Sequence, residues 1–447
     1  MQASGHPSLL HFAAVNVPRY TSYPTAPHFN ARIGSERYAA WLSALPADAT
    51  LSLYLHVPFC AELCLYCGCN TKAVRKREPV DRYLRSLIAE IELTASHLGS
   101  RRVTHLHWGG GTPSTLGEDG FQTVMDRLAR LFDLTELREH AIEIDPRHAN
   151  PSLAGTLARL GVNRASFGAQ DFSPEVQRAI GRVQPFEVVR RCIDAFRNAG
   201  IDGINIDLMY GLPRQSAASV ALNADLAASL QPGRIALFGY AHVPWLKKNQ
   251  RLIDAALLPG HEDRLAQARI AENVLTGHGY RAIGLDHFAD PCDPLAIAAE
   301  GGKLHRNFQG YTADQADALI GFGASAISRT PSGYAQNASD TAGYERAIAS
   351  SRLPTAKGIE LTADDTLRGL IIERLLCDLR VDLGALAPSE AFRSEISALR
   401  PFVDAGLVAI NGGQVVILEA GRSFARLIAA TFDAYPPANQ TRHSAAV

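Results

Sequence analysis

The sequence predicts an α/β protein in which parallel strands alternate with helices. Short apolar strands recur between about residues 50 and 240, and stretches of helical periodicity fill the gaps between them. The expected strands are 51–57, 104–108, 141–145, 164–168, 203–209 and 234–240. Six strand–helix units of this kind imply parallel strands joined by right-handed crossovers. Such a chain forms either a doubly wound open sheet or a complete or partial barrel.

The clearest expected helix lies between the first two strands. Apolar residues recur there at helical spacing from Val80 to Ile91, Pro79 stands at the start and Gly99 lies past the end. No G-x-G-x-x-G follows the first strand, which counts against a dinucleotide-binding sheet.

Unusual polar residues gather where the expected strands end. They are Cys60 to Cys69, "GGGTP" at 109–113, Glu143, Asp145, Gln170, Asp207, Tyr240 and His242. Chemistry at the C-terminal ends of successive parallel strands is typical of barrel-type α/β enzymes. The sequence therefore favours a barrel or partial barrel with its active site at that end.

Composition narrows the function classes. The formal net charge is −1 and 20% of the residues are charged, which argues against bulk binding to nucleic acid or to an anionic membrane. No apolar run approaches the length of a membrane span, and the first twenty residues lack the features of a signal peptide. We therefore expect a cytoplasmic protein.

The chain is expected to contain four consecutive segments. Residues 1–47 form an N-terminal extension, 48–290 the barrel, 291–357 an irregular connection over the barrel mouth, and 358–447 a mostly helical domain with a small β-hairpin around Asn411-Gly412. The last domain resembles a winged helix, but residues 356–447 carry nine Lys/Arg against eleven Asp/Glu. It is therefore expected to be a cover or partner surface rather than a DNA-binding domain.

The informative motif is the cysteine cluster after the first strand. Cys60, Cys64, Cys67 and Cys69 have the spacing C-x3-C-x2-C-x-C, whereas the other three of the seven cysteines are isolated. A structural zinc site usually combines two separated pairs, and the ferredoxin spacing is absent. The C-x3-C-x2-C part suits a loop around three corners of a [4Fe–4S] cluster whose fourth iron takes an outside ligand. A structural zinc site remains the simpler alternative.

With Tyr66 before the third cysteine, this motif resembles that of the radical S-adenosylmethionine (radical SAM) superfamily. Further segments occur in order along the chain: "PRYTSYPTA", "HLHWGGGTPS", "IEIDPR", "GAQDF", "NIDLMYGLPRQ", "FGYAHVP", "LHRNFQGYT" and "GFGASAIS". Together they resemble the oxygen-independent coproporphyrinogen III oxidase family of bacterial haem synthesis. The resemblance runs from about residue 18 into the C-terminal domain and implies a partial (βα)6 barrel.

The resemblance also implies the site residues. Cys60, Cys64 and Cys67 match the three cluster ligands, and Cys69 is a family-specific cysteine that could aid catalysis or shape the loop. The residues that match contacts to a first SAM are Tyr54, Tyr66, Gly110, Glu143 and Ile327. Those that match contacts to a second SAM are Gly111, Thr112, Gln170, Arg182, Asp207 and Ala241. Ordinary alternatives are a core role for Ile327 and a solvated helix position for Arg182.

The implied reaction is the anaerobic oxidative decarboxylation of two propionates of coproporphyrinogen III to vinyl groups, giving protoporphyrinogen IX. A 5′-deoxyadenosyl radical from SAM starts it at the [4Fe–4S] cluster. Four substrate carboxylates call for cations. Arg19, His305 and Arg306 are nominated because their irregular polar segments could fold over the barrel mouth as a lid. The implied partners are coproporphyrinogen III and a flavodoxin or ferredoxin reductant; we expect a monomer and no nucleic acid. The alternatives are a radical SAM haem chaperone and a haem-degrading methyltransferase relative.

Overall fold

The computed structural model describes residues 7–388 and 390–435, and the ends of the first and last expected segments lie outside these ranges. The chain divides into two compact units, and each unit is discontinuous in sequence. One unit, called here the cysteine-loop unit, comprises residues 29–207 and 314–361. The other, called the terminal unit, comprises residues 1–28, 208–313 and 362–447. The expected division into four consecutive segments does not coincide with these units.

The cysteine-loop unit contains a mixed sheet. Its strand order is β16-β15-β14-β13-β1-β4-β5-β6, followed by β7. The strands are β1 (Leu51–Val57), β4 (Val103–Gly110), β5 (Glu139–Ile144), β6 (Arg164–Gln170), β7 (Gly203–Tyr210), β13 (Ala318–Phe322), β14 (Ile327–Thr330), β15 (Gly333–Asn337) and β16 (Thr355–Glu360). Neighbouring strands from β1 to β6 pair in parallel, as expected. β7 continues past Asp207 into the terminal unit.

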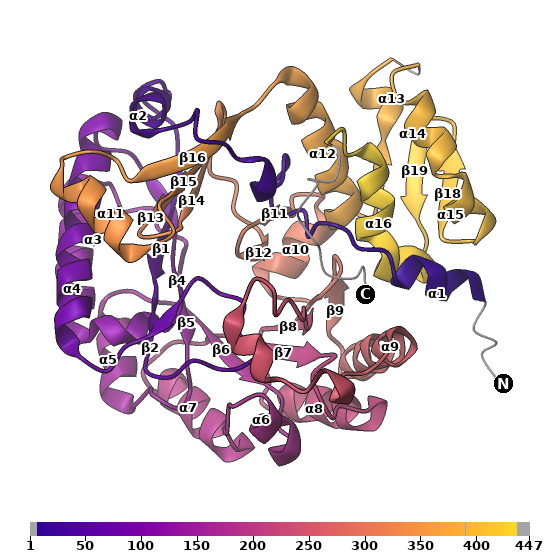
Figure 1. Ribbon diagram of the computed structural model, residues 1–447, viewed down its shortest axis with the longest axis horizontal. Helices are drawn as coiled ribbons and strands as arrows, with labels where there is room; N and C mark the ends of the chain where they lie inside the picture. The colour runs from indigo at the N-terminus through magenta and orange to yellow at the C-terminus, as the bar shows by residue number, and fades with distance from the viewer. Residues whose placement is uncertain (1–6, 389, 436–447) are drawn as a thin grey trace. The chain divides into compact units, whose positions relative to one another are not determined.

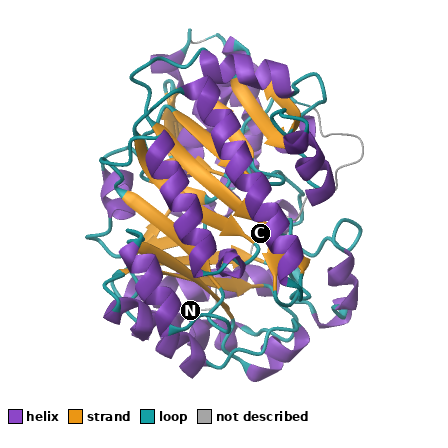
Figure 2. Cartoon of the chain, turned by 90° about the vertical axis from the view of Figure 1, so that its left-hand side faces the viewer, coloured by secondary structure: helices purple, strands orange, loops and turns teal. Residues whose placement is uncertain are grey.

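Helices connect and cover these strands (Figure 1; Figure 2 colours helices and strands separately). They are α2 (Ser35–Ser43), α3 (Arg77–Leu98), α4 (Glu118–Leu131), α5 (Pro151–Arg159), α6 (Pro174–Ala179), α7 (Phe186–Asn198) and α11 (Thr341–Ala349). The helix expected from Pro79 onward is α3, which ends at Gly99 with φ +67. Its apolar residues Tyr83, Leu87 and Ile91 are fully buried, so the sequence periodicity identified the packed face correctly.

One expectation about this unit is wrong. The stretch 291–357 was expected to be irregular, but it contains two strands of the terminal unit and, in the cysteine-loop unit, β13, β14, β15 and the start of β16. β13 pairs in parallel with β1 on the side opposite β4, and β14, β15 and β16 extend the sheet as antiparallel strands. These strands are only four to six residues long and contain Gly333 and Gly358, which weaken a strand pattern in the sequence.

The terminal unit begins with α1 (Pro7–Ala13) and continues after the end of β7. Its middle part contains α8 (Ala217–Ser229), β8 (Arg234–Gly239), α9 (His261–Gly277), β9 (Arg281–Ile283), β10 (His287–Ala289), α10 (Pro294–Glu300), β11 (His305–Asn307) and β12 (Gly310–Thr312). β8 pairs with β10, β10 pairs with β9, and β11 pairs with β12, all antiparallel. Short 3-10 turns lie at Ala26–His28, Lys248–Leu252 and Ala255–Leu257.

The C-terminal part of this unit has the expected helices and hairpin. The helices are α12 (Ala363–Cys377), α13 (Leu383–Leu386), α14 (Arg393–Ala398), α15 (Arg400–Asp404) and α16 (Ala425–Ala429). β18 (Val408–Asn411) and β19 (Gln414–Ile417) form the hairpin, and β17 (Arg380–Asp382) adds a third strand that the sequence analysis did not expect. Tyr20 and Tyr23 of the N-terminal segment share a buried core with Ile371, Leu375 and Phe432.

The described residues contain no helix that is both long and apolar enough to cross a membrane.

The six strands expected from the sequence are all present as β1, β4, β5, β6, β7 and β8.

Candidate active site

The cysteine loop leaves the C-terminal end of β1 and returns to α3. Its two ends are joined by the short parallel pair β2 (Phe59–Cys60) and β3 (Lys72–Ala73). The backbone N–H of Val74 donates to the carbonyl of Cys60 at 2.9 Å, and that of Leu65 donates to the carbonyl of Ile180 at 3.0 Å. The loop is therefore held both at its base and near its tip, so that its cysteines occupy defined positions.

Two of the three predicted ligands have distinct polar surroundings. Thr112 donates its hydroxyl to Cys60 Sγ at 3.5 Å, and the hydroxyl of Thr71 lies 3.2 Å from the same sulfur. Arg182 Nη1 donates to Cys64 Sγ at 3.5 Å, and Arg147 Nη2 at 3.7 Å. Burial raises the pKa of the Cys60 thiol, and the hydrogen bonds from Thr112 and Thr71 act against that rise. Iron binds the thiolate form of cysteine, which hydrogen bonds to the sulfur stabilise.

A buried carboxylate holds these two arginines. Asp145 pairs with Arg147 at 2.7 Å and with Arg182 at 3.2 Å, and the side chains of Asp145 and Arg182 are each 8% exposed. Burial alone would raise the pKa of Asp145, but the hydrogen bonds from Arg147 and the charge of Arg182 lower it to about 2. The group is therefore a fixed carboxylate, and Arg182 is not the solvated helix residue of the ordinary alternative.

The fourth cysteine of the loop behaves differently. Cys69 is exposed, and its thiol is hydrogen-bonded to that of Cys67. In the described part of the chain, no three His, Cys, Asp or Glu side chains are spaced as ligands of a single metal ion. A cubane cluster needs wider spacing than a single ion, because each thiolate binds a different iron.

The triglycine segment after β4 is required by close packing within the protein. Gly110 has φ +110, and a Cβ at this position would lie 2.6 Å from the ring of His56. At Gly111 a Cβ would lie 2.5 Å from the carbonyl oxygen of Phe59. The family resemblance predicts that these glycines contact SAM. Their packing against β1 and β2 is a second reason for glycine, and it follows only from the folded structure.

Glu143, at the end of β5, is tied to this segment. It accepts a hydrogen bond from the N–H of Gly110 at 3.0 Å, and its carboxylate lies 3.6 Å from His107 Nε2. Because only one carboxylate oxygen receives the backbone bond, the group is oriented while retaining acceptor capacity for a ligand.

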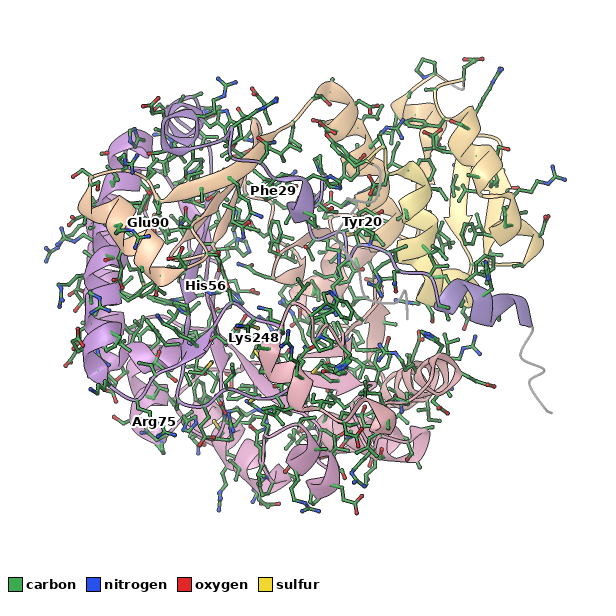
Figure 3. The ribbon with its side chains drawn as sticks, in the orientation of Figure 1. Tyr20, Phe29, His56, Arg75, Glu90 and Lys248 are labelled. Atoms are coloured by element: carbon green, nitrogen blue, oxygen red, sulfur yellow. The ribbon has the colours of Figure 1, made fainter. Side chains whose placement is uncertain are left out.

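Tyr54 and His56 form a pair on β1, and the sequence analysis named only Tyr54. The Tyr54 hydroxyl lies 3.1 Å from His56 Nδ1, and His56 Nε2 lies 2.9 Å from the carbonyl of Asn70 (His56 is labelled in Figure 3). A carbonyl can only accept, so Nε2 carries the proton and Nδ1 accepts from Tyr54. Burial lowers the pKa of His56, which keeps the ring neutral. The alternation of β1 hid this residue, because His56 resembles an ordinary buried strand position.

Two of the residues nominated for a second SAM, Gln170 and Asp207, lie on the neighbouring strands β6 and β7. Gln170 has φ +65, a conformation that is costly for a non-glycine residue and that is found mainly at functional sites. Ser166 donates to both carboxylate oxygens of Asp207 at 3.1 Å, and Arg182 donates to the carbonyl of Gly168 at 2.7 Å. Burial, together with the nearby charge of Glu143, raises the pKa of Asp207 to about 7.

Nearly all the nominated residues belong to the cysteine-loop unit. Tyr66 is half-buried, and Ile327 is a half-buried first residue of β14 whose backbone packs against Gly321. The exceptions are Ala241 and the three substrate candidates, which belong to the terminal unit. There Arg19 and Arg306 line one pocket, whereas His305 lies 3.2 Å from Glu373 and is not among the lining residues.

A partial barrel with three cysteines on the loop after its first strand defines a protein of the radical SAM class. The radical SAM superfamily matches residues 54–227 of the chain. The chain is 47% identical over 437 residues to the oxygen-independent coproporphyrinogen III oxidase of Bradyrhizobium diazoefficiens. The alignment covers 96% of this chain and 97% of that protein. It is 42% identical to the enzyme of the same name from Paracoccus denitrificans, with 96% of each chain covered.

A solved structure agrees with the sequences. Coproporphyrinogen III oxidase from Escherichia coli, described as a radical SAM enzyme, is 37% identical and has a TM-score of 0.89. The match covers 94% of this chain and 98% of that one. The chain therefore belongs to the oxygen-independent coproporphyrinogen III oxidase family, and the expected radical SAM fold is confirmed.

Proposed function

We propose that this protein catalyses the oxygen-independent oxidation of coproporphyrinogen III to protoporphyrinogen IX in haem biosynthesis. In this reaction two propionate side chains lose CO2 and become vinyl groups. The observation that carries the proposal is the loop of three cysteines whose sulfurs receive hydrogen bonds from Thr112, Arg147 and Arg182. Relatives named for this activity align over nearly the whole chain.

The family implies a [4Fe–4S] cluster and SAM as cofactors. When bound, they supply a 5′-deoxyadenosyl radical that abstracts a hydrogen atom from the propionate carbon adjoining the pyrrole. Cys60, Cys64 and Cys67 would hold the cluster, and the guanidinium groups of Arg147 and Arg182 offset part of its negative charge. The fourth iron must take SAM, so Cys69 is assigned no cluster bond.

The remaining loop-side residues bind and orient the first SAM. Glu143, oriented by the N–H of Gly110, offers a carboxylate oxygen to ribose hydroxyls or to an ammonium group. Tyr54, Tyr66 and Ile327 supply flat or apolar surface that excludes water from the reacting atoms.

A second SAM is part of the proposal. Gln170 and Asp207 come from the neighbouring strands β6 and β7 of one unit, Arg182 donates to the carbonyl of Gly168 on β6, and the positive φ of Gln170 supports a functional role for this position. Gly111, Thr112 and Ala241 complete the set implied by the family resemblance.

Several further parts of the function are also proposals. The substrate carboxylates are assigned to Arg19 and Arg306, which line one pocket, with His305 on the same segment as Arg306. We assign the reductant to a flavodoxin or ferredoxin, the oligomeric state to a monomer, and the location to the cytoplasm. The seven cysteines are thiols, as expected in a reducing compartment.

The test is an anaerobic assay with reconstituted protein, SAM, a reductant and coproporphyrinogen III. We expect brown protein, cleavage of SAM, and the release of CO2 with formation of protoporphyrinogen IX. Cys60→Ser should abolish all three, whereas Cys292→Ser, which changes an exposed cysteine of the terminal unit, should abolish none. Stoichiometric haem binding without turnover would instead indicate the chaperone, and SAM cleavage with haem breakdown would indicate the methyltransferase relative.

A further inference from the structure

A pocket of the terminal unit is lined by five arginines. They are Arg19, Arg264, Arg306, Arg422 and Arg426. Only two carboxylates, Asp286 and Glu272, belong to the same lining, which therefore carries an excess of three positive charges. The hollow is partly open to solvent and encloses about 850 Å3 when its open mouth is included.

These arginines come from distant parts of the chain, so no sequence window contains the cluster. Arg19 belongs to the N-terminal segment, Arg264 to α9, Arg306 to β11 and Arg426 to α16. Evenly scattered charge would not bring five guanidinium groups into one hollow in a chain whose formal net charge is −1. The concentration of charge at this place calls for an anionic ligand.

The surrounding contacts hold the guanidinium groups in place. Arg19 Nη2 donates to the carbonyl of Gly239 at 3.3 Å, and Arg422 Nε donates to that of Gly284 at 2.7 Å. Arg264 lies over the ring of Tyr210, with 5.5 Å between its guanidinium carbon and the ring centroid. Arginines held in this way lose little freedom when they bind a ligand.

Arg306 supplies the clearest sign of a missing partner. Its side chain is 6% exposed, yet Nε and Nη1 have no hydrogen-bond acceptor. The nearest carboxylate, that of Asp286, lies 3.8 Å from Nη1, beyond hydrogen-bond distance. Buried donors without acceptors are rare in folded proteins and often mark the place of a ligand.

The electrostatics of the pocket agree with the geometry. Burial, together with the positive charges of Arg19 and Arg306, lowers the pKa of Arg426 to about 10. Burial also lowers the pKa of Arg19, with a smaller contribution in the same direction from Arg306. An incoming anion would relieve this repulsion.

Apart from Ser423, the uncharged residues of the lining are apolar or aromatic. Leu237, Phe238, Leu285 and Phe288 contribute to it, together with Tyr210 and Tyr240. A ligand that fits both surfaces has carboxylates attached to a large apolar ring system, which is the chemistry of a tetrapyrrole with propionate side chains.

We infer that this five-arginine pocket binds the propionates of the tetrapyrrole that are not decarboxylated. The inference rests on the proposed function for its choice of ligand. A propionate that reacts first loses a hydrogen atom to the 5′-deoxyadenosyl radical and then loses CO2 and one electron to an electron acceptor, so the negative charge of its carboxylate disappears. A bidentate guanidinium pair would stabilise that charge and oppose the loss. Guanidinium groups are therefore suited to the two propionates that the product retains, and they fix which side chains remain to react.

The test uses coproporphyrin III, the stable oxidised form of the substrate ring, and measures its Kd for the anaerobically purified protein by fluorescence. We expect Arg264→Gln and Arg426→Gln each to raise the Kd by roughly 10-fold or more, as expected for loss of a charge-assisted hydrogen bond. Arg281→Gln removes the same charge from an exposed ion pair of the same unit and should leave the Kd unchanged.

Measurements on the wild-type protein keep the inference testable if a variant fails to fold. The tetramethyl ester of coproporphyrin III should bind much more weakly than the acid, and the affinity for the acid should fall as salt is added. Protoporphyrin IX has only two propionates, which are the retained ones, and should be bound nearly as tightly as coproporphyrin III. Equal affinity for acid and ester, or pocket variants with wild-type Kd, would overturn the inference.

Failure of the proposed function would look different. A wild-type protein that binds coproporphyrin III through these arginines but never decarboxylates coproporphyrinogen III would contradict the proposed reaction and leave the pocket in place. If the wild-type protein decarboxylates coproporphyrinogen III normally while the pocket variants bind coproporphyrin III with the wild-type Kd, the pocket inference is contradicted and the proposed reaction stands.

Discussion

Arg182 donates from Nη1 to the sulfur of Cys64 at 3.5 Å and from Nη2 to the carboxylate of Asp145 at 3.2 Å. Arg147 makes the same two kinds of contact from the other side, with Cys64 at 3.7 Å and Asp145 at 2.7 Å. One buried carboxylate thus positions two cations against one cluster ligand. Since net charge and hydrogen bonds to sulfur set the reduction potential of an iron–sulfur cluster, these arginines should tune it.

Replacing Arg147 tests this tuning. Arg147→Gln removes one positive charge near the cluster while Arg182 still pairs with Asp145, so reduction of the cluster becomes less favourable. One charge at a separation of about 8 Å and an effective dielectric of about 20 is worth roughly 2 kcal/mol, or a shift of roughly 90 mV to more negative potential for a one-electron couple. A redox titration followed by electron paramagnetic resonance would measure the shift. Arg190→Gln removes an exposed arginine, 45% accessible, and should leave the potential unchanged.

The four cysteines of the loop should fall into two classes. Cys60→Ser, Cys64→Ser and Cys67→Ser should lose the cluster, because a serine hydroxyl does not replace a thiolate on a soft metal. Cys69→Ser should retain the brown colour and the iron content, because Cys69 is an exposed free thiol that is hydrogen-bonded to Cys67 and is assigned no bond to iron. Iron and sulfide analysis of the reconstituted variants would distinguish the classes. Loss of iron in Cys69→Ser would contradict the assignment of an open fourth iron.

The sequence was sufficient for strands β1, β4, β5 and β6 and for the cluster loop, because their signals are local. Strand β1 and the motif from Cys60 to Cys67 lie within one short stretch, and the spacing of apolar residues in α3 predicts a helix. Strands β14 to β16 were missed because their stability comes from pairing with the edge at β13, which no local pattern reveals.

The same reason limited the site. Arg147 and Arg182 are 35 residues apart and meet only through Asp145, and the arginine pocket draws on residues from Arg19 to Arg426. The one signal available for Arg147 was its place two residues after Asp145, at the end of an expected strand. Arg19 and Arg306 were nominated from irregular polar segments, whereas Arg264 and Arg426 lie on ordinary helices and offered no signal.

The number of SAM molecules is testable at Asp207. Its carboxylate is held by Ser166, and burial raises its pKa to about 7, so the charged form becomes dominant only above neutral pH. If this carboxylate attracts the positive charge of a second SAM, the weaker of two binding steps should strengthen as the pH rises through about 7. Isothermal titration calorimetry should show two equivalents for the wild type and one for Asp207→Asn. The exposed Asp202, changed to Asn, is the matched control, and a single equivalent for the wild type would contradict the second site.

Glu90 carries a separate prediction about stability. This residue of α3, labelled in Figure 3, is 2% exposed. It accepts hydrogen bonds from the N–H of Gly323 at 2.6 Å, from Asn337 Nδ2 at 2.6 Å and from the Tyr344 hydroxyl at 2.7 Å. Burial raises its pKa from 4.5 to about 7 in spite of these donors. Between these two values the folded protein binds more protons than the unfolded chain, so stability should fall as the pH rises from 4.5 to about 7.

Glu90→Gln should remove this part of the pH dependence and also destabilise the protein. The amide NH2 of glutamine meets groups that themselves donate, so at least one buried donor loses its acceptor at a cost of about 1–3 kcal/mol. Urea unfolding at several pH values would show both effects as a lower midpoint and a flatter profile. Glu92→Gln, on the exposed side of the same helix, should change neither, because its ion pair with Arg127 lies at the surface. An unchanged pH profile in Glu90→Gln would mean that Glu90 is not the group whose protonation stabilises this fold.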